Sequence, residues 1–181
     1  ADPDTVLHAM ADALEDRLGS SVEILKKVHG PRAEVKKNMQ FVGFDAYQKL
    51  IDSGVDVVLL ATPPGFRPAH LTAAIDAGKH VFYEKPVAVD GPGIRKVMEA
   101  AKKAKEKNLS IVSSLCFRYD LQKQALFGKV LNGDIGEVKS ISSTRYGGEL
   151  WFKERQPDWN DMQYKMRNWY YFNWLCGDHI T

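Results

Sequence analysis

The sequence lacks the features that mark several common classes of protein. Its 181 residues include only two cysteines, Cys116 and Cys176, without the spacing of a metal site or a redox motif. Both lie among apolar residues, so two buried thiols are expected. No apolar run approaches the roughly 20 residues that span a membrane. Lys and Arg total 25 against 23 Asp and Glu, and this small excess gives no reason to expect a nucleic-acid or membrane partner.

What the sequence contains is an alternation of strand and helix patterns. Repeated strand–helix units of this length require parallel strands with right-handed crossovers. The predicted fold class is therefore α/β, with a doubly wound parallel sheet of the Rossmann, dinucleotide-binding kind. Apolar runs predict strands at 6–11, 55–61, 80–83 and 109–115, and helical spacing predicts helices near 14–28, 68–78 and 121–131, with two more that Asp45 and Asp90 can cap.

The pattern changes after residue 120. From Gly136 to Tyr146 polar and apolar residues alternate, which is typical of an antiparallel strand with one solvated face. We therefore predict two domains. Residues 1–120 form the dinucleotide-binding domain, and residues 121–181 begin a C-terminal substrate and oligomerisation domain of the α+β kind, with a mostly antiparallel sheet.

A glycine-rich G-x-G-x-x-G turn is also missing, although a dinucleotide fold needs one after its first strand. The first strand pattern of this chain, at Val6, is followed by Asp12 instead. An acid at a strand end belongs to the second strand of such a fold. We therefore expect the first strand, the glycine turn and the first helix upstream of Ala1, and most of the C-terminal domain beyond Thr181.

Asp12 is a candidate for binding both ribose hydroxyls of adenosine. Its carboxylate would repel the 2′-phosphate of NADP, because two unit charges about 4 Å apart interact with on the order of 4 kcal/mol at an effective dielectric constant near 20. No Arg follows at once to accept that phosphate, so NAD is the expected cofactor and NADP is disfavoured. The alternative is that Asp12 caps the start of the following helix.

A second segment carries the most specific motifs. The chain resembles the glucose-fructose oxidoreductase, inositol dehydrogenase and rhizopine-catabolism (Gfo/Idh/MocA) family, and the resemblance covers nearly the whole sequence. The family pattern is a strand, A-T-P, a helix, A-G-K-H-V and then E-K-P. Matching residues are 61–63 (ATP), 77–81 (AGKHV), 84–86 (EKP), 117–120 (FRYD) and 133–138 (GDIGEV).

The resemblance implies roles for several of these residues. Lys85 would lie between nicotinamide and substrate, where a buried ammonium stabilises the developing alkoxide. Glu84 would bind the nicotinamide ribose, and Pro86 would follow a cis peptide bond that turns Lys85 inward. Thr62, Pro63 and Pro64 would form the loop over the nicotinamide half of the cofactor. Without the family pattern, Glu84 and Lys85 read as a solvated pair at a strand end.

The sequence departs from the family at three places. Pro64 stands where Asn commonly follows Thr-Pro, and Arg67 stands where the family has His. Cys116 stands where the family often has Asn, which weakens the case for a polar cofactor contact there. Arg118 is the better candidate for a contact near the nicotinamide or the substrate. His70 is expected to face its own helix neighbourhood rather than the ligand.

Aromatic residues are concentrated near the C-terminus, from Trp151 to Trp174. Aromatic faces beside polar groups suit a sugar site, but the same residues suit a buried core under the second domain's sheet. The candidate substrate residues here are Arg167, Trp169 and Tyr170, with Asn168 among the polar groups, and Asp178 and His179 as residues near the pocket. The family's catalytic His, the general base, is expected beyond Thr181.

The predicted function is NAD-dependent hydride transfer between nicotinamide and the alcohol of a sugar, polyol or sugar derivative. The resemblance leaves two alternatives open: a glycosidase that uses tightly bound NAD for transient oxidation, and a non-catalytic NAD-binding protein on the same fold. The expected partners are a small sugar-like substrate and further copies of the chain, as a dimer or tetramer. No metal is predicted. A cytoplasmic location is the default, and a periplasmic one would need an upstream twin-arginine signal.

Overall fold

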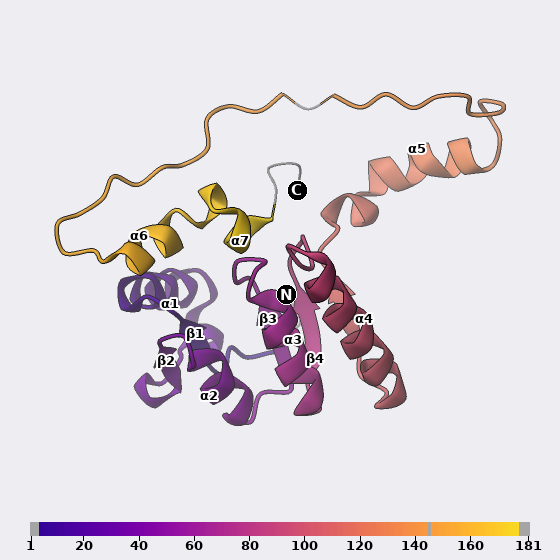
Figure 1. Cartoon of the computed structure of the whole chain (residues 1–181). Coiled ribbons are helices and arrows are strands. Elements are labelled where there is room, and N and C mark those ends of the chain that lie inside the picture. The colour runs from indigo at the N-terminus through magenta and orange to yellow at the C-terminus, as the bar shows by residue number, and fades with distance from the viewer. Residues whose placement is uncertain (1–3, 145, 178–181) are drawn as a thin grey trace.

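Parallel strands joined by helices make up most of the chain as far as residue 113 (Figure 1). The structure, a computed structural model, describes residues 4–144 and 146–177. In chain order the strands and helices are β1 (Met10–Asp12), α1 (Glu15–His29), β2 (Gln40–Val42), α2 (Ala46–Asp52), β3 (Val57–Leu60), α3 (Arg67–Asp76), β4 (His80–Tyr83), α4 (Gly91–Glu106), β5 (Ile111–Ser113), α5 (Leu121–Leu131), α6 (Asp161–Arg167) and α7 (Asn173–Cys176). Strand and helix therefore alternate as the sequence predicts.

Every strand pairing among the described residues is parallel. β1 pairs with β2, with Met10 opposite Gln40. β3, β4 and β5 form a second sheet in that order, with Leu60 opposite Tyr83. The Rossmann-type α/β class is thus confirmed, although the strands form two sheets, of two and three strands, rather than one continuous sheet. β1 starts at Met10 and not at Val6, because β2 offers only three partner residues.

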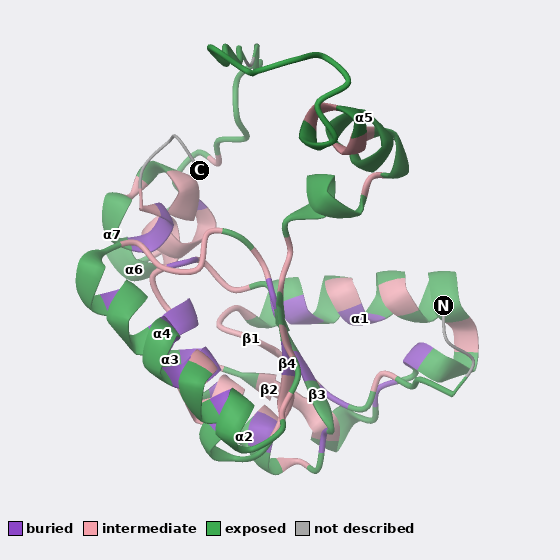
Figure 2. Cartoon of the chain, turned by 90° about the vertical axis from the view of Figure 1, so that its right-hand side faces the viewer, coloured by how far each residue is buried: buried purple, intermediate pink, exposed green. Residues whose placement is uncertain are grey.

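The core lies between the three-stranded sheet and helices α2, α3 and α4 (Figure 2). Small residues on α3 and α4 let these two helices pack closely, since a side chain that ends at Cβ leaves room for the facing backbone. The completely buried residues of this core include Leu71, Ala74, Ile75 and Ala104. The core fixes β3 and β4, the two strands that carry the candidate motifs.

Two helix starts illustrate how local sequence sets the boundaries. Asp90 caps α4 as expected, because its carboxylate accepts a hydrogen bond from the Gly93 amide at 2.7 Å. Asp45 holds the corresponding position on α2 but does not cap it. Its carboxylate instead pairs with Lys49 at 2.8 Å, one helical turn along the chain.

The predicted antiparallel strand at 136–146 is wrong for this structure. No residue described after β5 is in a strand, and this stretch runs as a long exposed arc (Figure 1). An isolated strand leaves its amide and carbonyl groups without ladder partners, and no described segment lies beside this one to supply them. Tyr146, for example, is 94% exposed. Cys116 is likewise exposed, against expectation, whereas Cys176 is buried as predicted.

The C-terminal segment then returns to the strand–helix region that precedes residue 113. α6 lies on α1, and α7 approaches the turn after β3 (Figure 1). The Gly65 amide donates a hydrogen bond to the Leu175 carbonyl at 2.8 Å, and Leu175 is completely buried. Among the described residues, no helix combines the length and the apolar character needed to cross a bilayer.

Candidate functional site

The candidate residues gather at one edge of the sheets because the strands are parallel. Asp12 ends β1, Thr62 follows β3, and Glu84 follows β4. Parallel strands direct all their carboxyl ends to the same edge, which is where open α/β sheets bind ligands. Ser114 follows β5 and donates its hydroxyl hydrogen to the Glu84 carboxylate at 2.9 Å. This bond links the ends of neighbouring strands and orients Glu84.

Asp12 is half-buried at the entrance to α1. One carboxylate oxygen accepts a hydrogen bond from the Leu14 amide at 2.8 Å. This bond lies before α1, whose N-cap residue is Leu14 and which has no side-chain cap, so Asp12 does not cap the helix. A carboxylate accepts through both oxygens, so this bond is compatible with a ligand hydroxyl on the other.

The Thr62 turn is held in place by two side chains of α3. The Thr62 hydroxyl and the His70 ring nitrogen Nδ1 lie 3.2 Å apart, and Arg67 donates to the Thr62 carbonyl. His70 is buried, and its ring stacks on Tyr47 with centroids 4.1 Å apart. Burial, with a contribution from the Arg67 charge, lowers the pKa of His70 to about 4. His70 is therefore neutral at pH 7 and, as expected, packs within its helix surroundings.

The second turn contains the E-K-P motif, and its Lys85–Pro86 peptide bond is cis, as the resemblance implied. The Glu84 amide donates to the Leu60 carbonyl at 3.0 Å, which continues the pairing of β3 with β4 by one residue. Lys85 is exposed, so the expected burial of its ammonium is not found. The reason is that no other described segment covers the Lys85 side chain.

Arg118 lies in a turn of 3₁₀ helix, Cys116–Tyr119, just beyond β5. Its amide donates to the Leu115 carbonyl at 2.8 Å, and its side chain is exposed. Arg118 thus follows the same strand edge as Glu84 and Lys85. Among the described residues, no group of three or more His, Cys, Asp or Glu side chains could hold a metal ion.

Arg167 lies at the other end of the edge, beside α1. Its two terminal nitrogens donate to the two carboxylate oxygens of Asp16, each at 2.8 Å, and its guanidinium stacks over the Trp159 ring at 4.5 Å. The hydrogen bond to Asp16 holds the pKa of Arg167 above its usual value, and the charge of Asp12 adds to this effect. The structure therefore places Arg167 beside α1, where its guanidinium is paired with Asp16.

The aromatic residues pack mainly on one another. Trp169 lies against Trp151 and Tyr170, with ring centroids 6.2 and 5.5 Å away. Asn168 is completely buried, where its side chain accepts from the Lys153 amide at 2.8 Å and donates to the Lys153 carbonyl at 3.0 Å. Asn168 thus has a structural role rather than the sugar-binding one. Asp178 and His179 lie outside the described residues.

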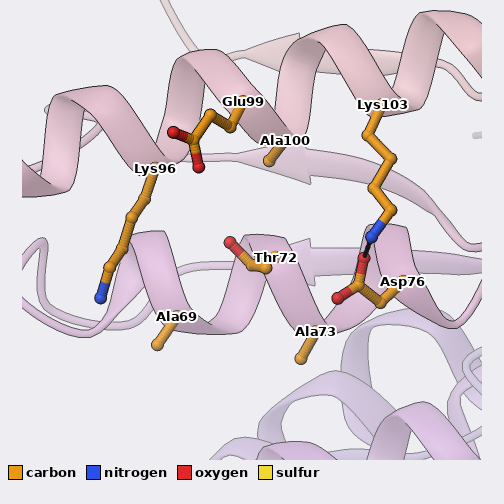
Figure 3. Close-up of a pocket in the computed structure, with 8 residues that line it drawn as sticks. All are labelled: Ala69, Thr72, Ala73, Asp76, Lys96, Glu99, Ala100 and Lys103. Atoms are coloured by element: carbon orange, nitrogen blue, oxygen red, sulfur yellow. Dashed lines mark hydrogen bonds and ion pairs between the residues drawn. The ribbon is translucent and has the colours of Figure 1, made fainter.

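One groove lies away from the strand edge. A groove of about 480 Å³ runs between α3 and α4 (Figure 3). Alanines line it, and an ion pair between Lys103 and Asp76 spans it. None of the candidate residues lines this groove. The groove forms where small side chains of the two helices face each other. It is separate from the candidate site.

One important residue was not assigned a role from the sequence. Arg67 is 2% exposed and donates to the Thr62 carbonyl and to the Pro86 carbonyl, in the turns after β3 and β4. Its position in place of the family's His was visible in the sequence. Its contacts were not, because they join three segments that become neighbours only in the fold.

Comparison with known proteins agrees with this arrangement. Residues 7–112 match an oxidoreductase family with an NAD-binding Rossmann fold. The chain is 28% identical over 141 residues to the myo-inositol 2-dehydrogenase of Thermotoga maritima, covering 78% of this chain and 38% of that one. It is 27% identical over 106 residues to a glycosyl hydrolase family 109 protein of Shewanella amazonensis, covering 55% and 23%.

A solved structure is similar to this chain in both sequence and fold. The myo-inositol 2-dehydrogenase from Lactobacillus plantarum shares 28% identity and a TM-score of 0.57, over 73% of this chain and 35% of that one. The chain thus spans less than half the length of these relatives.

Proposed function

The chain belongs to the Gfo/Idh/MocA oxidoreductase family, and from that premise we propose that its protein transfers hydride between a nicotinamide cofactor and a sugar-like alcohol. One observation carries the proposal: the Thr62 turn and the cis Lys85–Pro86 turn follow the adjacent strands β3 and β4 at the ligand-binding edge. This arrangement puts a flexible ammonium beside a fixed loop. The inositol dehydrogenases among the relatives support a polyol or sugar as the substrate.

The fit of this edge to NAD can be judged from the chain's own residues. Asp12 is an acceptor for the adenosine ribose, and Glu84, fixed by Ser114, is an acceptor for the nicotinamide ribose. The described residues contain no glycine turn after β1, so the pyrophosphate contacts are not part of this site. When bound, NAD supplies the hydride acceptor.

Lys85 has the role of an electrostatic catalyst. Its ammonium donates a hydrogen bond to the alcohol oxygen and stabilises the negative charge that grows there as the C–H bond breaks. Exposure of Lys85 in this chain leaves it free to contact a substrate that arrives from solvent. His70 is not the base that removes the hydroxyl proton, because it is buried and bonded to Thr62.

The distribution of buried residues supports separate functions for the two parts of the chain. We propose that residues 1–120 bind the cofactor and that residues from 121 onward begin the substrate and oligomerisation domain. The main cluster of buried apolar residues lies in the first part, whereas α5 buries none of its residues. Substrate contacts from Arg167, Trp169 and Tyr170 are part of the same proposal.

The test uses the full-length protein with NAD and a panel of inositols and hexoses. Lys85→Ala is expected to lower kcat by about a hundredfold or more, as removal of one transition-state donor does. The Kd for NAD should change only slightly. Lys102→Ala is the matched control, because Lys102 is an exposed lysine on α4, near the opposite end of the sheet. Equal turnover by Lys85→Ala and the wild type would refute the role of Lys85.

The similarity to a glycosyl hydrolase family 109 protein favours a second candidate, a glycosidase that oxidises its substrate transiently. The same assays separate the two functions. A dehydrogenase accumulates NADH with a free polyol or sugar. A glycosidase releases the leaving group of an aryl glycoside without net NADH. Binding of NAD without either reaction would identify a non-catalytic binding protein.

A further inference from the structure

Arg67 is a buried cation with an unusual set of partners. It is the first residue of α3, and its terminal nitrogens donate to the carbonyls of Thr62 and Pro86. Among the described residues, no ion pair with a carboxylate involves Arg67. Burial lowers the pKa of Arg67 to about 10, while the charge of Glu84 opposes that shift. The guanidinium is therefore still protonated at neutral pH.

Such a cation is costly to bury. Removing a guanidinium from water is strongly unfavourable unless all its donors find acceptors, and two neutral carbonyls compensate it only in part. Its Nε is buried without a hydrogen-bond partner. An apolar side chain of similar length would fill the same space without this penalty. The position therefore calls for a role other than stability.

The two carbonyls show what that role is. β3 and β4 are paired through Leu60 and Tyr83, and one more bond joins the Glu84 amide to the Leu60 carbonyl. Past this point the chains diverge into the Thr62 turn and the Glu84–Pro86 turn. Pro86 has no amide hydrogen to donate across the gap. Arg67 spans it, because a planar guanidinium donates in two directions at a fixed separation.

We propose that Arg67 is a positioning residue that fixes the distance between the Thr62 turn and the Lys85–Pro86 turn. The inference rests on the proposed function, in which these turns hold the nicotinamide loop and the substrate-facing Lys85. His70 assists from the same helix by holding the Thr62 hydroxyl. Arg67 does not touch the reacting atoms and acts through the two backbone carbonyls.

The experiment compares Arg67→Met, Arg67→Lys and Arg67→Ala with the wild type in the full-length protein. Arg67→Met is expected to lower kcat roughly tenfold or more, as loss of a charged hydrogen-bond donor does. The Kd for NAD should change much less, because the Asp12 end of the site is untouched. Arg67→Lys keeps the charge and should recover part of kcat. Arg95→Met is the matched control, since Arg95 is exposed on α4.

Two further readouts separate positioning from a general loss of structure. Millimolar guanidinium should restore part of kcat in Arg67→Ala and have no effect on Arg95→Met. In Arg67→Met, amide hydrogen exchange should accelerate at the non-proline residues of the two turns, while β1 and α1 keep wild-type rates; these residues are Thr62, Gly65, Glu84, Lys85 and Val87. If Arg67→Met fails to fold, kcat and amide hydrogen exchange are measured on Arg67→Lys instead.

The outcomes are distinct. Faster exchange with a lowered and guanidinium-restored kcat supports the proposal. Unchanged exchange, or faster exchange with wild-type kcat, overturns it. If the wild type neither binds NAD nor turns over any of the inositols and hexoses, the proposed function is refuted. The claim that Arg67 supports catalysis is then refuted with it. The exchange rates then still decide whether Arg67 holds the two turns together.

Discussion

Residues 7–113 and residues 121–177 differ in what they do with their apolar side chains. In the first region, Leu71 and Ile75 are completely buried between α3 and the sheet. In the second, α5 carries three leucines and Phe127, yet Leu131 is 84% exposed and no residue of α5 is buried. Apolar side chains therefore occur in both regions, but the packed core lies in the first, although Leu59 on the other face of β3 is 69% exposed.

The difference lies in where the partner comes from. In a strand–helix repeat, the next unit along the chain returns beside the last one and covers it. After residue 120 no such repeat follows, and coverage depends on distant contacts. Leu175 shows that such contacts can form, since it is buried against the Thr62–Gly65 turn. An apolar pattern thus predicts that a face is buried, but it does not identify the segment that buries it.

The largest expected effect tests this contrast directly. Leu71→Ala should lower the free energy of unfolding by roughly 3 to 4 kcal/mol, because it leaves a cavity in a packed core. Leu131→Ala, the matched change on an exposed helix face, should lower it by less than about 0.5 kcal/mol. Urea unfolding followed by circular dichroism measures both. A comparable loss for Leu131→Ala would show that α5 is covered in solution, and the contrast would fail.

A second prediction concerns pH and the first region alone. His70 has a pKa of about 4 in the folded chain, against about 6.5 in an unfolded one. Between these two pKa values the unfolded chain binds a proton that the folded chain does not bind. The free energy of unfolding therefore decreases as pH falls from about 6.5 to about 4. The loss amounts to up to about 3 kcal/mol. Below pH 4 this group adds no further change.

His70→Gln isolates this contribution, because carboxylates also titrate in the lower part of the same range. The difference in unfolding free energy between wild type and variant should shrink by most of that amount between pH 7 and pH 4. A difference that does not depend on pH would mean that the pKa of His70 is the same in the folded and the unfolded chain.

A third prediction concerns the contact between the regions. A Cβ on Gly65 would overlap the Trp174 carbonyl oxygen, so Gly65→Ala should displace α7 at a cost of about 1 to 3 kcal/mol. All four tryptophans lie after residue 150, so tryptophan fluorescence reports on the C-terminal segment. Gly147→Ala is the control, since its Cβ would meet nothing within 4 Å. Wild-type fluorescence in Gly65→Ala would show that α7 does not approach this turn.

The same contrast explains which features could be read from the sequence. The strand at 80–83 and the helix at 121–131 were predicted to the residue, because each depends on a local pattern that ends at a turn residue. The Asp90 cap is equally local. The cis bond before Pro86 followed from the family resemblance. Each of these features is decided within a few neighbouring residues.

What could not be predicted depends on segments far apart in the chain. The Arg67 contacts need the turns after β3 and β4 to be neighbours. The alternation at 136–146 was taken for a strand, although a strand also needs a partner, and the described residues offer none. The exposure of Lys85 and Cys116 could not be predicted either, because it depends on whether a distant segment covers them. A sequence shows that a residue is apolar or charged, but not which distant segment covers it.

The smallest expected effect concerns the ion pair that joins the two regions. Arg167 binds both oxygens of Asp16, but the Asp16 side chain is 59% exposed, so solvent screens the pair. Asp16→Asn should lower the free energy of unfolding by less than about 1 kcal/mol. It should nevertheless change the fluorescence of Trp159, whose ring lies under the Arg167 guanidinium. The control is Glu34→Gln, which removes an exposed pair with Lys26 inside the first region and should leave that fluorescence unchanged.

A double-mutant cycle over Asp16→Asn and Arg167→Met gives the coupling of the pair itself. Measurable coupling that weakens in high salt would mean that charge helps to hold α6 on α1. Zero coupling with unchanged fluorescence would mean that packing holds α6 and α7 in place without help from this pair, through contacts such as the Phe66–Trp174 ring contact and the hydrogen bond from the Gly65 amide to the Leu175 carbonyl.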